Sequence, residues 1–135
     1  VGVEVDLLVR GICALKPGVA GLSENIKVHS ILGRFLEHSR MYVFGEGAET
    51  RYFIGSADMM HRNLDRRVET LVEISQPDHR RYLEEIIELG TSEKVRHWSL
   101  SGDGNWTQLS HDENGNYLLD FQTYLIGRHP GPRSS

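Results

Sequence analysis

Five short apolar runs constrain the fold of this chain more than any other feature of its sequence. They occupy residues 3–10, 26–31, 40–44, 51–56 and 66–74, and none exceeds nine residues. Valine, isoleucine and aromatic residues, which favour strands, make up much of each run. Glycine and proline, which interrupt regular structure, recur between the runs, so each run is predicted to be a separate strand.

The clearest helix signal lies in residues 75–90, with the sequence SQPDHRRYLEEIIELG. Ser75 is typical of a helix N-terminus, Pro77 suits the first helical turn, and Gly90 is placed to end the helix. Apolar residues three and four apart predict one buried stripe along this helix. That stripe consists of Leu83, Ile86 and Ile87.

The remaining elements complete the predicted fold class. A short helix is expected over residues 31–38, where Ser30 can cap its first turn, and a partly helical segment over residues 57–65. The strands at 40–44 and 51–56 flank the glycine-containing linker GEGAET and predict a hairpin. Strands interleaved with helices are typical of the α/β class, so we expect a mixed β-sheet flanked by helices.

The chain is predicted to form a domain core over residues 1–97, followed by an extension over residues 98–135. The extension either belongs to the same domain or forms a partly disordered tail. Its turn pairs, Asp103-Gly104 and Asn114-Gly115, predict reversals, with a small hairpin around the second pair. The last residues, from Gly127, are expected to fray. Because the chain begins with Val1 rather than Met, we expect it to be a piece of a longer polypeptide.

The charge of the chain limits its partners. The formal net charge is −4, which argues against nucleic acid binding through bulk electrostatics. Residues 1–67 nevertheless carry nine Lys and Arg against eight Asp and Glu, whereas residues 68–135 carry six against eleven. An anion site is therefore expected in the first half of the chain. No apolar run approaches the roughly 20 residues that a membrane-spanning helix needs.

The single cysteine, Cys13, has no partner for an intrachain disulfide, which suits a reducing cytosol. We therefore expect a cytoplasmic protein, and peripheral attachment to a membrane stays open. The seven histidines and Cys13 lack the paired spacing of a structural zinc site, so no protein-bound metal is predicted. The GEGAET linker joins two strands rather than opening a helix, and it is therefore no dinucleotide fingerprint.

His38 and Arg40 form the first candidate site, at the start of the third predicted strand. Residues two apart in a strand point to the same face, so both side chains can reach one ligand. An imidazole can donate a hydrogen bond to an anion or carry a proton, and a guanidinium forks onto phosphate oxygens. The pair can form a phosphate clamp. The alternative is a surface histidine at the end of a helix, which the helix dipole favours.

Further basic residues lie near other strand ends. Gly55 and Ser56 end the fourth predicted strand, where open α/β folds tend to bind ligands. Arg10 ends the first strand, and Arg67 borders the fifth, where partial burial would require an anionic partner. Three arginines follow Gly55: Arg62, Arg66 and Arg67. The alternative is a polar loop in which these arginines pair with the carboxylates of Asp58, Asp65 and Glu69.

Two blocks of sequence resemble the last catalytic domain of bacterial polyphosphate kinase. The first, residues 5–44, contains LVRGIC, a following PG and RFLEHSR; the second, residues 52–70, contains SADMMHRNLDRR. The resemblance runs from about residue 3 to about residue 90. That family is similar in fold to the phospholipase D superfamily, so the resemblance implies a phospholipase D-like α/β fold. Met59 departs from the family pattern, in which a Trp is usual.

The resemblance implies a transferase that reversibly moves the γ-phosphoryl group of ATP to inorganic polyphosphate, with magnesium. It places the phosphorylated histidine and the magnesium-binding residues on a preceding domain that this chain lacks. Its implied partners are ATP, ADP, polyphosphate and the preceding domains, and a homo-oligomer stays open. The chain by itself is expected to be inactive.

Site residues follow from the resemblance one by one. Arg10 matches the ATP-binding arginine of the VRG motif, and His38 matches the ATP-binding histidine of the LEH motif, with a catalytic role on a phosphate oxygen. Arg67 matches the last arginine of RNLxRR and is expected to touch the triphosphate. Arg40 fits the motif and is expected either to bind phosphate or to brace its strand.

Two other functions stay open. A phospholipase D-like phosphodiesterase would form a covalent phosphohistidine at His38 and cleave a lipid or nucleic acid diester. Arg40 replaces the lysine of its His-x-Lys motif, Asp58 replaces the asparagine of its Gly-Ser-x-Asn motif, and no aspartate follows Arg40 at the expected distance. A non-catalytic anion-binding or assembly module would use the basic strand ends only to dock a partner.

Overall fold

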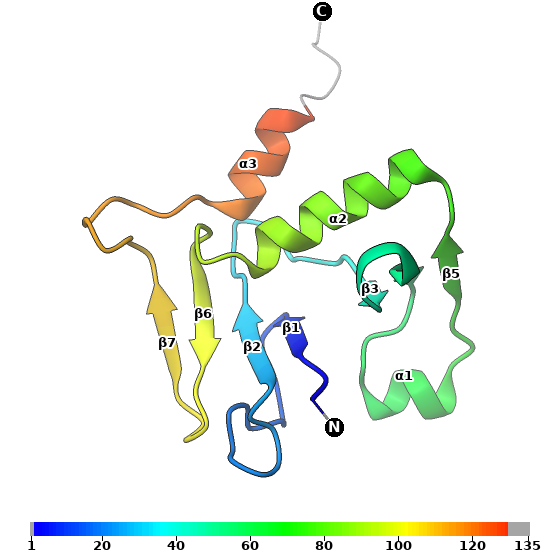
Figure 1. Cartoon of the computed structure of the whole chain (residues 1–135), viewed down its shortest axis with the longest axis horizontal. Coiled ribbons are helices and arrows are strands. Elements are labelled where there is room, and N and C mark those ends of the chain that lie inside the picture. Colours follow the sequence, from blue (N-terminus) through cyan, green and yellow to red (C-terminus); the bar gives the residue numbers. More distant parts are fainter. Residues whose placement is uncertain (1, 130–135) are drawn as a thin grey trace, which may run out of the picture. The chain divides into compact units, whose positions relative to one another are not determined.

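The computed structural model describes residues 2–129 (Figure 1). These residues divide into two compact units: residues 2–37 with 89–129, and residues 38–88. The predicted α/β class is confirmed, and each unit has its own sheet. None of the helices within residues 2–129 has the length and apolar character required to cross a membrane.

The first unit contains a four-stranded mixed sheet. Its strands are β1 (Val5–Val9), β2 (Ile26–Ser30), β6 (His97–Leu100) and β7 (Trp106–Leu109), in the order β1-β2-β6-β7. β1 is parallel to β2, whereas β6 is antiparallel to both β2 and β7. Helix α3 (Phe121–Arg128) follows, and the Asp120 side chain caps it by accepting a hydrogen bond from the Thr123 amide, 2.8 Å away.

The core of the first unit includes a close approach at Gly90. A Cβ atom at this position would lie 2.9 Å from a methyl group of Leu8 and 3.5 Å from the Phe121 ring. Helix α2 (Pro77–Thr91) continues past Gly90, so the prediction that Gly90 ends the helix is wrong. The absence of a side chain here instead lets the last turn of the helix pack against its neighbours. Other buried residues of this core are Val28, Ile31, Val95 and Leu100.

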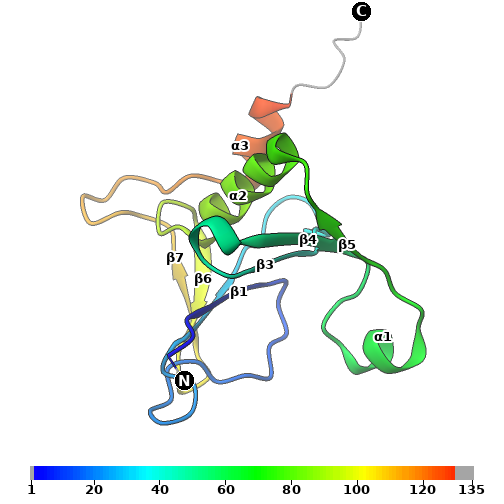
Figure 2. The same cartoon turned by 45° about the vertical axis from the view of Figure 1, so that its right-hand side comes forward.

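The second unit contains an antiparallel three-stranded sheet. β3 (Met41–Phe44), β4 (Arg51–Gly55) and β5 (Leu71–Ile74) lie side by side in that order (Figure 2). The predicted hairpin is confirmed, and the 3₁₀ turn η1 (Gly47–Glu49) lies in its connection. The hydroxyl of Tyr52 in β4 donates to Glu84 of α2 at 3.1 Å, so the first part of α2 covers this face of the sheet.

The segment between β4 and β5 differs from its prediction in one respect. Helix α1 (His61–Arg66) confirms the partly helical segment, and it continues to Arg66. Arg67 is the extended residue that ends α1, and β5 begins four residues later, at Leu71. The fifth strand is therefore shorter than residues 66–74, because the helix takes up its first residue and β4 pairs only with residues 71–74.

The predicted helix over residues 31–38 is wrong, because a distant side chain binds this backbone instead. Gln122 of α3 accepts from the Phe35 amide through Oε1 and donates to the Phe35 carbonyl through Nε2, both at 2.8 Å. A Cβ atom at position 33 would overlap the Gln122 side chain, so Gly33 is needed for this approach. The segment is irregular as a result.

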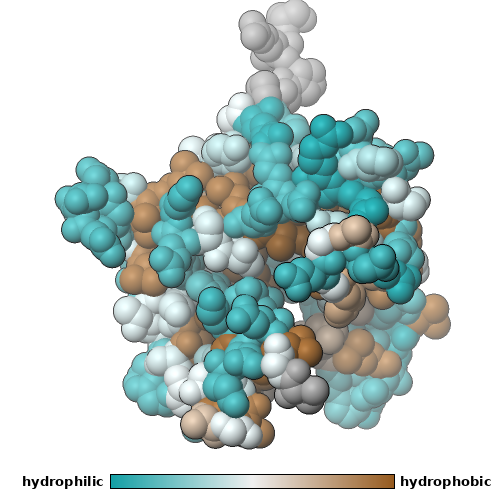
Figure 3. All heavy atoms as spheres, in the orientation of Figure 1, coloured by the Kyte–Doolittle hydropathy of each residue, from teal (hydrophilic) through white to brown (hydrophobic). Residues whose placement is uncertain are grey.

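The predicted boundary between residues 97 and 98 falls inside β6, which pairs with β2. The Asp103-Gly104 turn joins β6 to β7, and an antiparallel bridge between His111 and Tyr117 confirms the small hairpin around Asn114-Gly115. Hydrophobic surface lies beside the start of α3 (Figure 3). Leu109, which ends β7, and Leu119, which lies shortly before α3, are among the exposed apolar residues. Of the residues expected to fray, 130–135 lie outside the described residues.

Two histidines pack against each other in the first unit. The rings of His29 in β2 and His97 in β6 have centroids 4.7 Å apart. His97 is buried, and its Nδ1 donates to the Val95 carbonyl at 2.7 Å. Burial lowers the pKa of His29, and the charge that His97 would carry lowers it further. Asp6 and Glu93 oppose this effect, whereas Lys27 adds to it. The fold therefore favours neutral His29.

Replacing Gln122 with Ala should lower the free energy of unfolding by about 2 kcal/mol, because the amide group loses both hydrogen bonds to Phe35 and Gln122 is buried. Urea denaturation followed by circular dichroism would measure the loss. Gln108→Ala is the matched control, since Gln108 is exposed in β7 and should cost little. Equal stability of the two variants would contradict the role of Gln122.

The first unit should lose stability in mild acid because of His29. Its pKa is depressed on folding, so below the ordinary value of about 6.5 the unfolded chain binds more protons than the folded chain. The stabilisation is complete above that pH and declines as the pH falls through it. Thermal unfolding at about pH 7.5 and about pH 5.5 should show a smaller decline in His29→Gln than in the parent, with exposed His79→Gln as control. Equal declines in all three would contradict this prediction.

Candidate functional site

His38 and Arg40 contact each other at the start of β3, in the second unit. The Nη1 atom of Arg40 lies 3.0 Å from Nδ1 of His38. The Nε atom of Arg40 donates to the Asp58 carboxylate at 2.9 Å, and this bond is the main cause that raises the pKa of Arg40. The side chains of Arg40 and Asp58 are 18% and 21% exposed, whereas His38 is exposed. Arg40 therefore joins a carboxylate on one side to a histidine on the other.

The loop after β4 brings Asp58 to Arg40. The Gly55 amide donates to the Arg40 carbonyl at 2.9 Å and extends the pairing of β3 with β4. The Tyr42 hydroxyl donates to the Ala57 carbonyl at 3.0 Å and ties the loop to β3. Backbone and side-chain hydrogen bonds thus fix the position of Asp58.

Glu69 organises the other end of this loop. Its side chain is 13% exposed and accepts hydrogen bonds from the Ser56 hydroxyl and, at 3.3 Å, from the amide of Asn63. The Arg67 guanidinium forms an ion pair with it, also at 3.3 Å. Ser56 in turn accepts from the Thr70 amide at 2.9 Å. One carboxylate therefore links the loop, helix α1 and Arg67.

Arg67 does not have the surroundings that its sequence position suggested. Its side chain is 56% exposed and already pairs with Glu69, rather than being partly buried beside a strand. The alternative, in which the arginines of this loop pair with nearby carboxylates, is correct for Arg67. The other two carboxylates of that alternative have different partners: Asp58 binds Arg40, and Asp65 pairs with His61.

Arg10 follows β1 in the first unit. It is exposed, and its Nη1 donates to the Glu37 carbonyl at 3.1 Å. Glu37 immediately precedes His38 in the sequence. Because Arg10 belongs to one unit and His38, Arg40 and Arg67 to the other, convergence of all four on one ligand stays a prediction.

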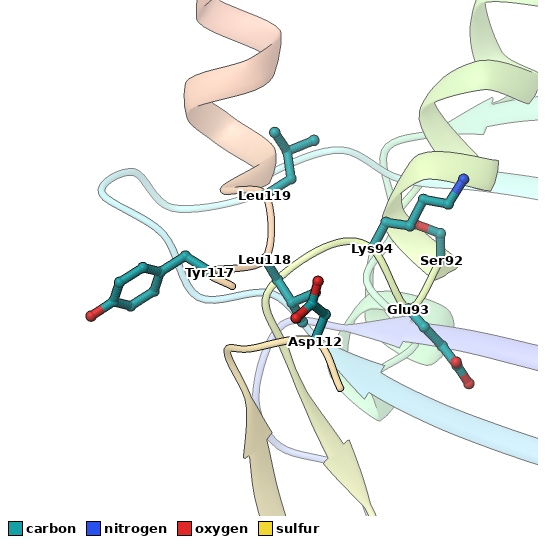
Figure 4. Close-up of a pocket in the computed structure, with 7 residues that line it drawn as sticks. All are labelled: Ser92, Glu93, Lys94, Asp112, Tyr117, Leu118 and Leu119. Atoms are coloured by element: carbon teal, nitrogen blue, oxygen red, sulfur yellow. The ribbon is translucent and has the colours of Figure 1, made fainter. Parts of the chain in front are cut away.

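A shallow hollow in the first unit lies among residues that the sequence analysis did not select (Figure 4). It is lined by Ser92, Glu93, Lys94, Asp112, Tyr117, Leu118 and Leu119. The Asp112 carboxylate accepts hydrogen bonds from the Asn116 side chain and from the backbone amides of Asn116 and Asn114, and these bonds lower its pKa. Two carboxylates and one lysine give this hollow no preference for anions.

Comparison with known proteins identifies the family. The family model described as "Polyphosphate kinase C-terminal domain 2" matches residues 1–118. The chain belongs to this family. The match extends past residue 90, where the sequence resemblance was expected to end.

Individual relatives agree with this assignment. The chain is 56% identical over 125 residues to polyphosphate kinase of Streptomyces coelicolor, covering 93% of this chain and 17% of that protein. It is 51% identical over 131 residues to polyphosphate kinase of Mycobacterium avium, covering 97% and 17%. The crystal structure of polyphosphate kinase from Porphyromonas gingivalis is similar with a TM-score of 0.81 at 35% identity, over 94% of this chain and 20% of that one. The chain thus spans about one sixth of its curated relatives.

Within the described part of this polyphosphate kinase domain, the side chains do not fit a protein-bound magnesium ion. Residues 2–129 contain no group of three or more histidine, cysteine or carboxylate side chains arranged to hold a metal. Two carboxylates of the candidate site already pair with arginines, Asp58 with Arg40 and Glu69 with Arg67. Magnesium that accompanies the nucleotide stays a prediction, and no step is derived through it.

Sequence reasoning missed the roles of Asp58, Asn63 and Glu69 in this polyphosphate kinase domain. Asp58 had a signal, since it stands where the related superfamily has the asparagine of Gly-Ser-x-Asn. Glu69 was considered only as a partner for arginines, although it also binds Ser56 and Asn63. Asn63 is 1% exposed within a polar segment, and no pattern in the sequence marks it as buried.

Replacing Glu69 with Ala should lower the free energy of unfolding by about 2 kcal/mol, because the buried amide of Asn63 and the hydroxyl of Ser56 lose a charged acceptor. Chemical denaturation would measure this. Glu73→Ala is the matched control: its bidentate pair with Arg51 is exposed and should contribute much less. A larger loss in Glu73→Ala than in Glu69→Ala would contradict this view of the network.

Proposed function

We propose that this chain supplies nucleotide- and phosphate-binding groups to a polyphosphate kinase, an enzyme that reversibly transfers the γ-phosphoryl group of ATP to inorganic polyphosphate. The observation that carries the proposal is the contact of exposed His38 with Arg40, in a chain whose relatives are polyphosphate kinases. Transfer of a phosphoryl group depends mainly on positioning and on neutralising charge, and donors of this kind supply both.

The proposed roles differ between residues. His38 and Arg10 are exposed and can bind phosphate oxygens directly. His38 would be the catalytic residue, since it would touch the transferred group. Arg67 is more than half exposed and can turn to a triphosphate while Glu69 holds its Nε. Arg40 is less exposed and engaged by Asp58 and His38, which favours a bracing role over ligand binding.

The rest of the reaction would lie outside this chain. The phosphohistidine would stand on the preceding domain, and magnesium would arrive with ATP or ADP. The chain by itself would then be inactive. The proposed setting is the cytoplasm, as part of the full-length enzyme.

The two alternatives make different predictions. A phosphodiesterase needs a cation free to bind the substrate phosphate, yet Arg40, which replaces that lysine, is bonded to Asp58. A phosphodiesterase would also hydrolyse a lipid or nucleotide diester, and this activity can be assayed directly. A non-catalytic module would bind an acidic protein more tightly than ATP or polyphosphate, and titration with each ligand would distinguish the two cases.

In a full-length polyphosphate kinase that carries this sequence, His38→Ala and Arg10→Ala should each lower the rate of polyphosphate synthesis by about 10²-fold, since each removes a donor to a charged phosphate group. Synthesis from ATP would be followed by release of ADP. His79→Ala is the control, because His79 is exposed on α2 and has no proposed role. Equal rates for all three variants would overturn the site assignment.

A further inference from the structure

Three side chains of the second unit form a chain of contacts that ends at an exposed imidazole. Asp58 accepts from Nε of Arg40 at 2.9 Å, and Nη1 of Arg40 lies 3.0 Å from Nδ1 of His38. Nη1 also donates to the His38 carbonyl at 3.4 Å. The side chains of Asp58 and Arg40 are mostly buried. Of these three side chains, the histidine ring is therefore the one that faces solvent.

The chemistry of arginine determines which way the last bond runs. A guanidinium has five N–H donors and no acceptor, and it stays protonated in proteins. His38 Nδ1 must therefore accept the bond from Arg40 with its lone pair. A neutral imidazole that accepts at Nδ1 carries its proton on Nε2. A doubly protonated ring would instead place two N–H groups against each other.

We propose that Asp58 and Arg40 are positioning residues that hold His38 as the neutral tautomer with its proton on Nε2, so that Nε2–H donates a hydrogen bond to a phosphoryl oxygen. The proposal rests on the proposed function in one respect, namely that His38 faces a phosphate. Asp58 fixes the guanidinium, the guanidinium fixes the ring, and the ring presents one donor to the ligand.

This arrangement suits the binding of phosphate rather than attack on it. To attack phosphorus, Nε2 would need a free lone pair in the plane of the ring. In this tautomer Nε2 instead carries the proton and has no such lone pair. The proton would have to leave Nε2, and the other nitrogen, Nδ1, already faces Arg40. A donor that is fixed before the reaction stabilises charge on the phosphoryl oxygens without reorganisation. His38 therefore acts as a hydrogen-bond donor, and a covalent phosphohistidine at this position is not expected.

The first test reads the tautomer directly in this chain. Long-range ¹H–¹⁵N correlation spectra of ¹⁵N-histidine-labelled protein distinguish a protonated from an unprotonated ring nitrogen. His38 should show protonated Nε2 and unprotonated Nδ1, and Arg40→Met should give a mixture of tautomers at His38. His79 is the internal control and should keep its spectrum. Protonated Nδ1 at His38 in the parent, or an unchanged tautomer in Arg40→Met, would overturn the proposal.

The second test asks whether Asp58 and Arg40 act through His38. In a full-length polyphosphate kinase that carries this sequence, Asp58→Ala and Arg40→Met should each lower kcat by about 10-fold to 100-fold, the usual effect of a misplaced catalytic group. In the His38→Ala background the same two changes should cause almost no further loss. Independent, multiplying losses would show a merely structural role and overturn the proposal.

The two tests also separate this proposal from the proposed function. If His38→Ala leaves synthesis unchanged, the proposed function of His38 fails, whatever the spectra show. If His38→Ala abolishes synthesis but the spectra show protonated Nδ1, the proposed function stands and the positioning proposal fails. Asp58→Glu is the conservative variant, because it keeps a carboxylate for Arg40; it should retain more activity than Asp58→Ala.

Discussion

The ion pair between Arg40 and Asp58 is the interaction on which the candidate site depends. A guanidinium that is only 18% exposed requires an anionic partner, because an unpaired charge loses its hydration on burial. The loop after β4 supplies that partner, and Tyr42 ties the same loop to β3. Fixed on one side, the guanidinium can reach His38 on the other. The orientation of the exposed imidazole therefore follows from a pair that is itself mostly buried.

The proposed anion site lies in an acidic chain, and carboxylates pair with two of its arginines. Asp58 and Glu69 neutralise much of the charge of Arg40 and Arg67, so the second unit does not depend on a broad positive field. Short-range hydrogen bonds from groups in fixed positions would bind phosphate instead. Such a site distinguishes ligands by geometry and is less sensitive to salt than a basic patch.

The elements that could be predicted from the sequence have local signals. The apolar runs at 3–10 and 26–31 became β1 and β2, and the amphipathic pattern of residues 75–90 became α2. The segment 31–38 has a helical pattern of apolar residues, yet Gln122, 87 residues away from Phe35, binds its backbone. β6 is only four residues long, and it is a strand because it pairs with β2 on one side and β7 on the other. Contacts of this kind leave no trace in a local window of sequence.

By itself the sequence determined the family, the α/β class and the residue types of the site, because motifs and hydrophobic periodicity are properties of neighbouring residues. It placed His38 and Arg40 two positions apart and so allowed them to share a ligand. The tertiary structure alone decided which carboxylate meets which arginine: Asp58 meets Arg40 across 18 residues, and Glu69 meets Arg67 together with Ser56 and Asn63. The physical reason is that ion pairs and hydrogen bonds depend on distances of a few ångströms, which only the folded backbone sets.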